Sequence, residues 1–430
     1  MSSPDAARPT YAAVLRVPHA RRTFTAALVG RLAYGLVSLS VLLASVRATG
    51  SYAVAGTIVA LFGATAVLLM PLRASLVDRH GPRRALPPMA ALYAGLLCAL
   101  AAATWRPGAP PVALGVLAAL AGACAPPLGP VMRAVWAELT ADRRLVQRAY
   151  SLDGVAEELL YVSGPVLVGF LVRYASPAAG VVVSAGLIVA GTAAFVTSPG
   201  VRRVPSPEGF GSSGRSLRRP GPGRAQQRTL DPALRGPVLV AAGAGLGISA
   251  VDLLVTAFAV RHGHGDAAAA WTLAALSAGS AVGGLLNGAI DWRTPAHRRL
   301  PRLAAGLGLA LGGAGLAPDL WTLAAALACA GVFVAPALTT AYLIADESAA
   351  PGTRTRAGAW INTGVNAGSS LGAATAGLLL AHAPLAHCFA AAGGTALLTA
   401  AAAVRGSRDP DRVRAPERGR SQGRVDGVSR

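Results

Sequence analysis

The sequence predicts an all-α integral membrane protein with twelve transmembrane helices in two six-helix repeats. Three observations support this fold class. Of the 430 residues, 53% are hydrophobic and only 13% are charged, whereas a soluble protein carries roughly 25% charged residues. Long stretches contain no Asp, Glu, Lys or Arg, and about 20 such residues are enough for a helix to cross the hydrocarbon core. The two halves of the chain also share an ordered set of matching residues.

The apolar stretches, taken in order, predict the twelve helices. They are continuously apolar and lack the alternation typical of a β-barrel. The predicted helices are Phe24–Val46, Tyr52–Leu72, Ala85–Thr104, Pro111–Val131, Ala156–Val172, Ala178–Thr197, Pro237–Val260, Ala268–Ile290, Leu303–Ala317, Leu320–Ile344, Ala357–Ala381 and Leu385–Val404.

These helices divide the chain into five regions. An N-terminal segment (1–23) precedes a first six-helix bundle (24–197). A linker (198–235) leads to a second six-helix bundle (236–404), and a tail (405–430) follows. The linker and the tail are dense in Gly, Pro, Ser and Arg, which predicts disorder because they offer almost nothing to bury.

The distribution of arginine predicts the orientation. All 39 basic residues are Arg, and alternate loops hold most of them. The Arg-rich loops contain Arg79, Arg83, Arg84, Arg143, Arg144, Arg148, Arg293, Arg298, Arg299, Arg354 and Arg356, together with the linker. The positive-inside rule therefore places both termini in the cytoplasm of a multi-pass plasma-membrane protein. The net charge of +20 is explained by this placement beside the lipid bilayer, without a nucleic-acid partner. We expect the chain to be a monomer.

The internal repeat indicates a transporter. Gly30, Gly50 and Asp78 match Gly243, Gly263 and Asp291 at one constant offset, and Arg148 and Gly164 match Arg356 and Gly372 at a similar one. Pro127 falls near Pro336 in the same way. Two parallel repeats joined by a polar linker are typical of transporters in which one half rocks against the other around a midplane site.

The loop after the second helix reads ASLVDRHGPRRAL. It resembles the loop signature G-x-L-x-D-R-x-G-R-R of the major facilitator superfamily, with Ala74 in place of the leading Gly. Asp78, Arg79, Gly81 and Arg83 keep the pattern, while Pro82 replaces one of its basic residues. Arg84 follows directly, and Asp291 is the copy of Asp78 in the second half. The resemblance implies a cytoplasmic latch that stabilises the outward-open state. A carboxylate at a helix end can also accept bonds from a neighbouring helix N-terminus, while the arginines alone could serve only as topological anchors.

A second motif favours export. SGPVLVGFL in the fifth helix, with Gly164 and Pro165, is similar to the antiporter motif of the family but lacks its second Gly of the pair. A plain packing kink is the alternative interpretation. No charge occurs between Pro107 and Met132, so we expect the family's deep arginine in the fourth helix to be absent.

Four charged residues within the predicted spans are candidates for function, because a charge at mid-bilayer costs on the order of 3 kcal/mol. They are Arg31, Glu157, Glu158 and Asp252. Arg31 could bind an anionic substrate group, pair with Glu157 or Glu158, or extend to the headgroups. Asp252 could take up a proton. The matching positions in the other half are Ala244, Val365, Asn366 and Leu39, none of them charged.

Polar side chains extend this candidate cavity. Tyr34 lies three residues after Arg31 and shares its helix face, so it could contact substrate. Asn362 and Asn366 form a stripe in the eleventh helix, which could bind ligand or form hydrogen bonds between helices.

These features together predict a secondary active transporter that works by alternating access, as a proton-coupled exporter of a hydrophobic or amphipathic solute. Its partners are then a small-molecule substrate and protons. No nucleotide-binding loop G-x-x-x-x-G-K-[ST] occurs, and the His and Cys residues show no metal-ligand spacing, so we expect no cofactor, no metal and no enzymatic activity. A transport-incompetent sensor or scaffold on the same fold remains the alternative, followed by a membrane-embedded enzyme.

Overall fold

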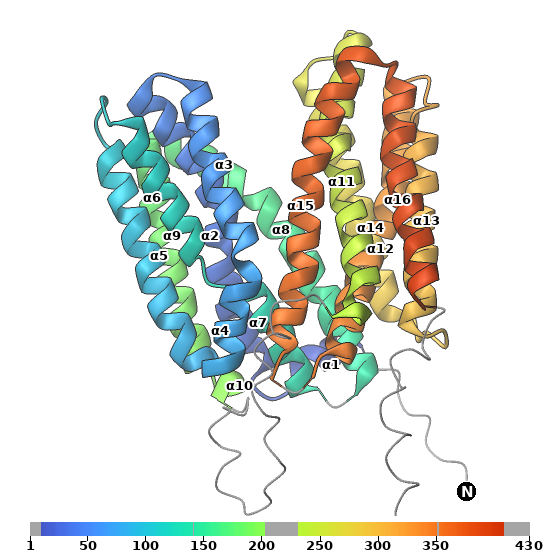
Figure 1. Ribbon diagram of the computed structural model, residues 1–430, viewed down its shortest axis with the longest axis horizontal. Helices are drawn as coiled ribbons and strands as arrows, with labels where there is room; N and C mark the ends of the chain where they lie inside the picture. Colours follow the sequence, from blue (N-terminus) through green and yellow to red (C-terminus); the bar gives the residue numbers. More distant parts are fainter. Residues whose placement is uncertain (1–9, 141, 203–230, 351, 408–430) are drawn as a thin grey trace, which may run out of the picture.

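The computed structural model describes residues 10–140, 142–202, 231–350 and 352–407, and within them the chain is helical without strands (Figure 1). The N-terminal half contains α2 (Ala20–Thr49), α3 (Tyr52–Leu68), α4 (Met70–His80), α5 (Pro82–Thr104), α6 (Pro111–Cys124), α7 (Leu128–Leu139), α8 (Arg143–Tyr174) and α9 (Pro177–Thr197). The C-terminal half contains α11 (Pro232–Arg261), α12 (Asp266–Ala289), α13 (Ala296–Ala314), α14 (Leu320–Ser348), α15 (Arg354–His382) and α16 (Leu385–Ser407). Two short helices, α1 (Tyr11–Arg16) and α10 (Pro199–Arg202), flank the first half.

The described helices make twelve membrane-spanning units, as the sequence predicts. Nine are long and apolar enough to cross a bilayer by length and composition, and the bent pair α3–α4 makes ten. The remaining two are α13 and α15, with 19 and 29 residues. Their arginines and asparagines lower the hydropathy, but each packs within the C-terminal bundle beside α16 or α11.

Two spans of the N-terminal half are broken. α3 and α4 meet at Leu69 with a bend of 43°, and α6 and α7 are separated by Ala125–Pro127. Proline removes a backbone donor and interrupts a helix, so carbonyl groups are left without helical partners. The buried guanidinium of Arg73 donates to the carbonyls of Gly122 and Ala125 at 2.8 and 2.5 Å, and also to Ala66.

The fourth span therefore continues past the end that the sequence predicts. It runs from Pro111 to Leu139 and includes Arg133, which is buried. The expectation that the fourth span lacks a deep arginine is wrong, because α7 continues to Leu139, past the predicted end at Val131.

Glycines set close helix contacts in both halves. A Cβ on Gly164 would lie 2.3 Å from the carbonyl oxygen of Gly35, so α8 and α2 touch backbone to backbone. Gly368 approaches the Ala242 carbonyl in the same manner and brings α15 onto α11. Such small-residue contacts are typical of helix association in membranes. Lipid is as apolar as the side chains, so the hydrophobic effect does not drive helices together and close packing is needed instead.

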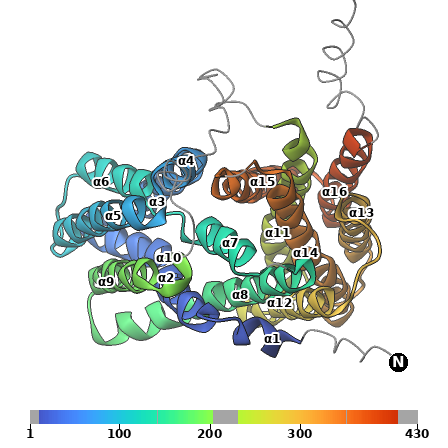
Figure 2. The ribbon, with the colours of Figure 1, turned by 90° about the horizontal axis from the view of Figure 1, so that it is seen from below.

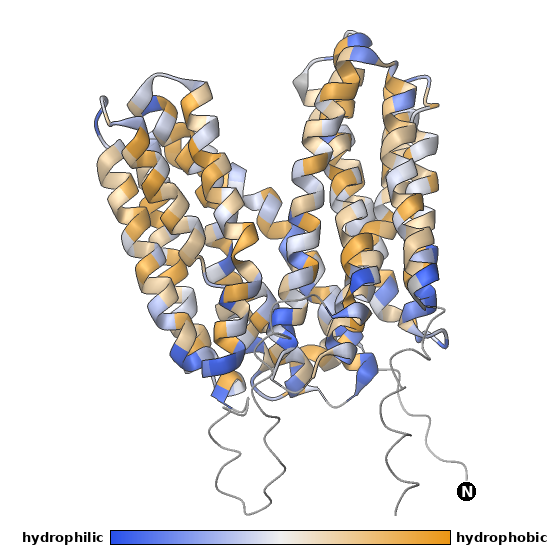
Figure 3. Cartoon of the chain, in the orientation of Figure 1, coloured by the Kyte–Doolittle hydropathy of each residue, from blue (hydrophilic) through white to orange (hydrophobic). Residues whose placement is uncertain are grey.

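The two bundles lie side by side when viewed from below (Figure 2). They converge at the end that carries α1 and α10 and diverge toward the opposite end (Figure 1). The hydrophilic residues gather at the converging end, while the helices are mostly apolar along their length (Figure 3). We call the converging end the Arg-rich end, because it holds Arg143, Arg148, Arg299 and Arg354.

The helices extend further into the predicted segments than expected. α1 and the start of α2 lie within the predicted N-terminal segment, and α10 and the first residues of α11 lie within the predicted linker. α16 continues to Ser407, inside the predicted tail. The remainder of the N-terminal segment (1–9), of the linker (203–230) and of the tail (408–430) falls outside the described residues.

Candidate functional site

A buried cluster of four charged side chains lies inside the N-terminal half. We call it the charge cluster: Arg31 on α2, Arg133 on α7, and Asp153 and Glu157 on α8. Arg31 contacts Asp153 at 2.6 Å and Glu157 at 3.0 Å. Arg133 contacts Asp153 at 3.1 Å and also Glu157. Each carboxylate therefore binds both guanidinium groups.

Two positive and two negative charges make the charge cluster neutral. Desolvating single ions costs several kcal/mol each, and only good geometry with further hydrogen bonds offsets that cost. The Arg31 side chain is 3% exposed, so it does not extend to the headgroups. Glu157 is 27% exposed and is the member of the cluster that solvent reaches most easily.

The charge cluster touches the C-terminal half through one aromatic ring. The guanidinium carbon of Arg133 lies 3.8 Å from the ring centroid of Tyr342 on α14. A cation over a tyrosine face is attracted by the ring quadrupole. The hydroxyl of Tyr150 donates to the carbonyl of Arg133 at 3.1 Å and fixes the α7 backbone against α8.

Sequence reasoning missed Arg133, Asp153 and Tyr342 as site residues. Arg133 was placed beyond the end of the fourth helix, and Tyr342 lies in an apolar stretch with no distinguishing neighbour. The internal repeat relates Arg133 and Tyr342 to each other, since the offset that matches Pro127 with Pro336 also matches Arg133 with Tyr342. The two residues therefore occupy equivalent positions in the two halves.

The other predicted cavity residues lie apart from the charge cluster or have different partners. The hydroxyl of Tyr34 donates to the Pro126 carbonyl at the break between α6 and α7. Glu158 accepts a hydrogen bond from Ser280 of α12 at 3.0 Å, across the two halves. Asp252 is exposed on α11, and among the described residues its carboxylate has no hydrogen bond or ion pair.

The asparagine stripe bonds within its own helix. The amide of Asn366 donates to the backbone and side-chain oxygens of Asn362 at 2.8 and 2.7 Å. The neighbouring Thr363 instead reaches across and donates to the Val67 carbonyl at 3.4 Å.

Both predicted latch carboxylates lie between the halves at the Arg-rich end. Asp78, near the end of α4, accepts hydrogen bonds from the backbone N–H groups of Thr355 and Arg356 at 3.1 and 2.8 Å. These groups belong to the first turn of α15, where the helix dipole favours a negative charge. Asp291 lies at the matching position and accepts from Arg148 of α8 at 3.3 Å, with Arg144 at 3.7 Å.

The remaining motif residues surround these carboxylates. Gly81 has a φ of 78°, which lets the chain turn directly from α4 into α5. Arg79, Arg83 and Arg84 are exposed at the same end. In the fifth span, α8 runs unbroken through Pro165.

Further hydrogen bonds and ion pairs join the halves at the Arg-rich end. The amide of Gln147 donates to the Asn287 carbonyl at 2.5 Å. Arg143 pairs with Glu347, and Arg354 pairs with Glu138. From α1, outside the membrane spans, the Tyr11 hydroxyl donates to the Leu285 carbonyl at 2.5 Å. Burial raises the pKa of Tyr11, while the charge of Arg148 opposes the rise, so this hydroxyl stays a donor at neutral pH.

The charge cluster and the contacts between the halves consist of ion pairs and hydrogen bonds that can form and break. Among the residues that the structure describes, no group of three or more His, Cys, Asp or Glu side chains could hold a metal ion. In the charge cluster, a partly exposed carboxylate shares two guanidinium groups with a buried one. Such a carboxylate can exchange a guanidinium partner for a proton or for a hydrogen-bond donor of a substrate, and a released guanidinium can bind an anion.

The sequence profile of the Major Facilitator Superfamily matches residues 23–317 and 296–427 of the chain. No curated protein sequence matches.

Solved structures match over nearly the whole chain. A bacterial homologue of the iron transporter ferroportin, in its outward-facing state, has 13% identity and a TM-score of 0.68, covering 90% of this chain and 99% of that one. The human organic anion transporter MFSD10 (TETRAN) has 16% identity and a TM-score of 0.65, covering 90% and 99%. A variant of the E. coli fucose:proton symporter FucP has 15% identity and a TM-score of 0.63, covering 90% and 98%.

Proposed function

The chain belongs to the major facilitator superfamily, and we propose that it is a secondary transporter that moves a small molecule by alternating access. More specifically, it works as a proton-coupled exporter of a hydrophobic or amphipathic solute in the plasma membrane, with both termini in the cytoplasm. The Arg-rich end is then the cytoplasmic end.

The observation that carries this proposal is the pair of matched carboxylates, Asp78 and Asp291. Each joins the end of one bundle's second span to the start of the other bundle's fifth span. Their hydrogen bonds hold the halves together only while the Arg-rich end is closed. When the halves rock apart, both carboxylates lose their partners and are hydrated instead. Two such states with a small free-energy difference are what alternating access requires.

Proton coupling rests on Glu157. Its carboxylate neutralises Arg31 and Arg133 together with Asp153, and it is partly exposed. A proton taken up on Glu157 removes one negative charge and leaves the two guanidinium groups with a single carboxylate. Ionised Glu157 is also the stronger acceptor for a hydrogen-bond donor of an amphipathic solute, and the proton weakens that contact. Proton and solute therefore compete for Glu157, as export driven by an inward proton gradient requires. Glu158 and Asp252 are the alternative proton sites in this proposal.

Gradient-driven flux in proteoliposomes tests these statements. A pH gradient is imposed, and uptake or release of a panel of lipophilic and amphipathic fluorescent solutes is followed for the wild type and for Glu157→Gln. The variant should lose gradient-driven flux but keep solute exchange without a gradient, because only the proton site is removed. Glu158→Gln and Asp252→Asn test the two alternative sites.

Each outcome decides a different part of the proposal. Gradient-driven flux that survives in Glu157→Gln and disappears in Asp252→Asn would move the proton site to α11. Flux that ignores the gradient in the wild type would refute proton coupling. No flux for any solute would refute the transporter and favour a sensor on the same fold.

A further inference from the structure

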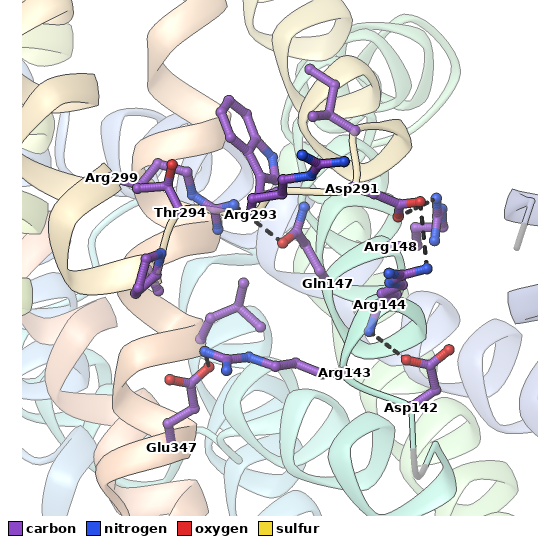
Figure 4. A pocket seen from close by; sticks show the side chains of 15 residues that line it. Asp142, Arg143, Arg144, Gln147, Arg148, Asp291, Arg293, Thr294, Arg299 and Glu347 are labelled. Atoms are coloured by element: carbon purple, nitrogen blue, oxygen red, sulfur yellow. Dashed lines mark hydrogen bonds and ion pairs between the residues drawn. The ribbon is translucent and has the colours of Figure 1, made fainter. Parts of the chain in front are cut away.

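A cavity of about 330 Å³ lies between the two halves at the Arg-rich end (Figure 4). The first turns of α8 line it from the N-terminal half. The loop between α12 and α13, the start of α13 and the end of α14 line it from the C-terminal half. It lies apart from the charge cluster, since none of Arg31, Arg133, Asp153 or Glu157 lines it.

Positive charge is in excess in this cavity. Five arginines and three carboxylates line it, and the carboxylates already have partners. Glu347 pairs with Arg143 at 2.5 Å, and Asp291 pairs with Arg148 at 3.3 Å. Asp142 accepts the backbone N–H of Arg144 at 2.9 Å and caps α8. Two arginines of the cavity, Arg293 and Arg299, form no ion pair with a carboxylate among the described residues, although the charge of Glu347 still acts on Arg299.

Of the two, Arg299 gives the stronger evidence for an anion site, because it is buried. It is 4% exposed, and its one hydrogen-bond partner within the described part of the chain is the side-chain oxygen of Gln147, at 3.3 Å. Its guanidinium lies over the Trp292 ring, 4.8 Å from the centroid. Among the residues that the structure describes, its Nε atom has no hydrogen-bond partner, and neither has one terminal nitrogen of the buried Arg148. A buried guanidinium without an anion is costly, and a bound anion would offset that cost.

We propose that this cavity binds a phosphate-type oxyanion, carried either by a soluble phosphate ester or by the headgroup of an anionic lipid. Arg299 and Arg293 supply the charge, since a guanidinium matches the paired oxygens of a phosphate. The side-chain amide of Gln147 lies between them and the α8 arginines (Figure 4). The volume is within the range of small-molecule sites.

The anion is bound by one conformation only. Gln147 and Arg148 belong to the N-terminal half, and Arg293 and Arg299 belong to the C-terminal half. The site is therefore assembled only when the Arg-rich end is closed. By linkage, an anion that binds this state favours it over the open one.

The test measures binding of inorganic phosphate and pyrophosphate to the full chain in nanodiscs of phosphatidylcholine alone, by titration calorimetry. The wild type should bind saturably. Arg299→Gln should weaken binding about tenfold or more, because a charge-assisted hydrogen bond is lost. Arg302→Gln is the matched control, since Arg302 is exposed one turn further along the same helix and outside the cavity. Its affinity should equal that of the wild type.

Two results would overturn the site: equal affinity in Arg299→Gln and the wild type, or an equal loss in Arg302→Gln. If Arg299→Gln does not fold, Arg293→Gln decides instead, because Arg293 is exposed in the loop and its replacement should also weaken binding.

A second arm identifies the source of the anion. Nanodiscs with phosphatidic acid should lower the apparent affinity for free phosphate if a lipid headgroup occupies the cavity. Unchanged affinity assigns the site to a soluble ester. No saturable binding in either nanodisc would refute the proposal.

Discussion

In both halves the first helix packs on the last through a matched glycine, but only one half buries a cluster of opposite charges beside it. Gly30 contacts Gly191 of α9, and its counterpart Gly243 contacts Thr399 of α16. Near Gly30 the N-terminal half holds the charge cluster. The matching C-terminal positions of Arg31, Asp153 and Glu157 are Ala244, Ile361 and Val365, and all three are apolar.

This difference separates scaffold from function. The C-terminal half forms the same bundle without these charges, so the fold does not require them. Buried ion pairs also contribute little net stability, because desolvation offsets most of the Coulombic gain. A cluster that is unnecessary for the fold and costly to desolvate is best explained by a role in binding or coupling. The predictions below test this separation, beginning with the largest expected effect.

Removing one charged side chain from the charge cluster should have the largest effect on stability. Asp153→Leu leaves Arg31 and Arg133 with only Glu157 as a partner. We expect a loss of about 3–5 kcal/mol in the free energy of unfolding, since removing one partner leaves an uncompensated buried charge. Denaturant titration of the purified protein in detergent micelles measures this loss.

The comparison with the C-terminal half supplies the control. Replacing all four members of the charge cluster by apolar residues should restore most of the stability while flux stays absent. The variant is Arg31→Met, Arg133→Met, Asp153→Leu and Glu157→Leu. If the fourfold variant is as unstable as Asp153→Leu alone, the charge cluster is needed for the fold of this half, and the distinction drawn here between scaffold and function is wrong.

The sequence predicted the spans well because their signal is local. Continuous apolar stretches and the Arg-rich loops need no knowledge of packing. The matched glycines and the pair of Asp78 and Asp291 could also be found from sequence, because aligning the two halves of the chain places identical residues at the same positions. Arg133 was lost at a boundary, since the predicted fourth helix ends at Val131, two residues before it, whereas α7 continues to Leu139.

The sequence could not show which charged side chains lie next to one another in the folded protein. Glu157 and Glu158 of α8 were recognised but Asp153 was not, and nothing in the chain order shows that Asp153 lies between Arg31 and Arg133. Likewise, the Arg299 charge could be counted, but its burial without a carboxylate depends on how α13 packs beside α8. Such pairings are decided by helix rotation, and a rotation of one residue moves a side chain by about 100°.

The next largest effect compares the two latch carboxylates. Asp78 accepts two backbone N–H groups at the start of α15, whereas Asp291 accepts from arginine side chains and is 28% exposed. Asp78→Asn should shift the population toward the open Arg-rich end about tenfold or more, because charge-assisted bonds and the helix dipole are lost. Asp291→Asn should shift it by a smaller factor.

Distances between spin labels on α5 and α15 at the Arg-rich end report these populations. A larger shift for Asp291→Asn than for Asp78→Asn would reverse the assigned order of the two latches. Equal flux rates in both variants and the wild type would show that neither carboxylate limits the conformational change.

A smaller effect is expected at the one ring that joins the charge cluster to the other half. Tyr342→Leu removes the aromatic face below Arg133 and should destabilise the closed state by about 1 kcal/mol. Tyr342→Phe keeps the ring and should behave like the wild type in the same spin-label measurement. If both variants destabilise the closed state equally, the hydroxyl rather than the ring makes the contact between the halves.

The smallest effect should come from the exposed ion pair between α7 and α15. Glu138 and Arg354 lie 2.5 Å apart, but their side chains are 41% and 33% exposed, and solvent screens such pairs so that they contribute about 1 kcal/mol or less. Glu138→Gln should therefore change the closed population by less than Asp78→Asn, and added salt should erase the difference from the wild type. Arg354 keeps Asp346 as a second partner at 3.3 Å, which reduces the loss further. A shift as large as that of Asp78→Asn, or one that persists in high salt, would mean that side-chain pairs at the surface, rather than the matched Asp positions, hold the two halves together.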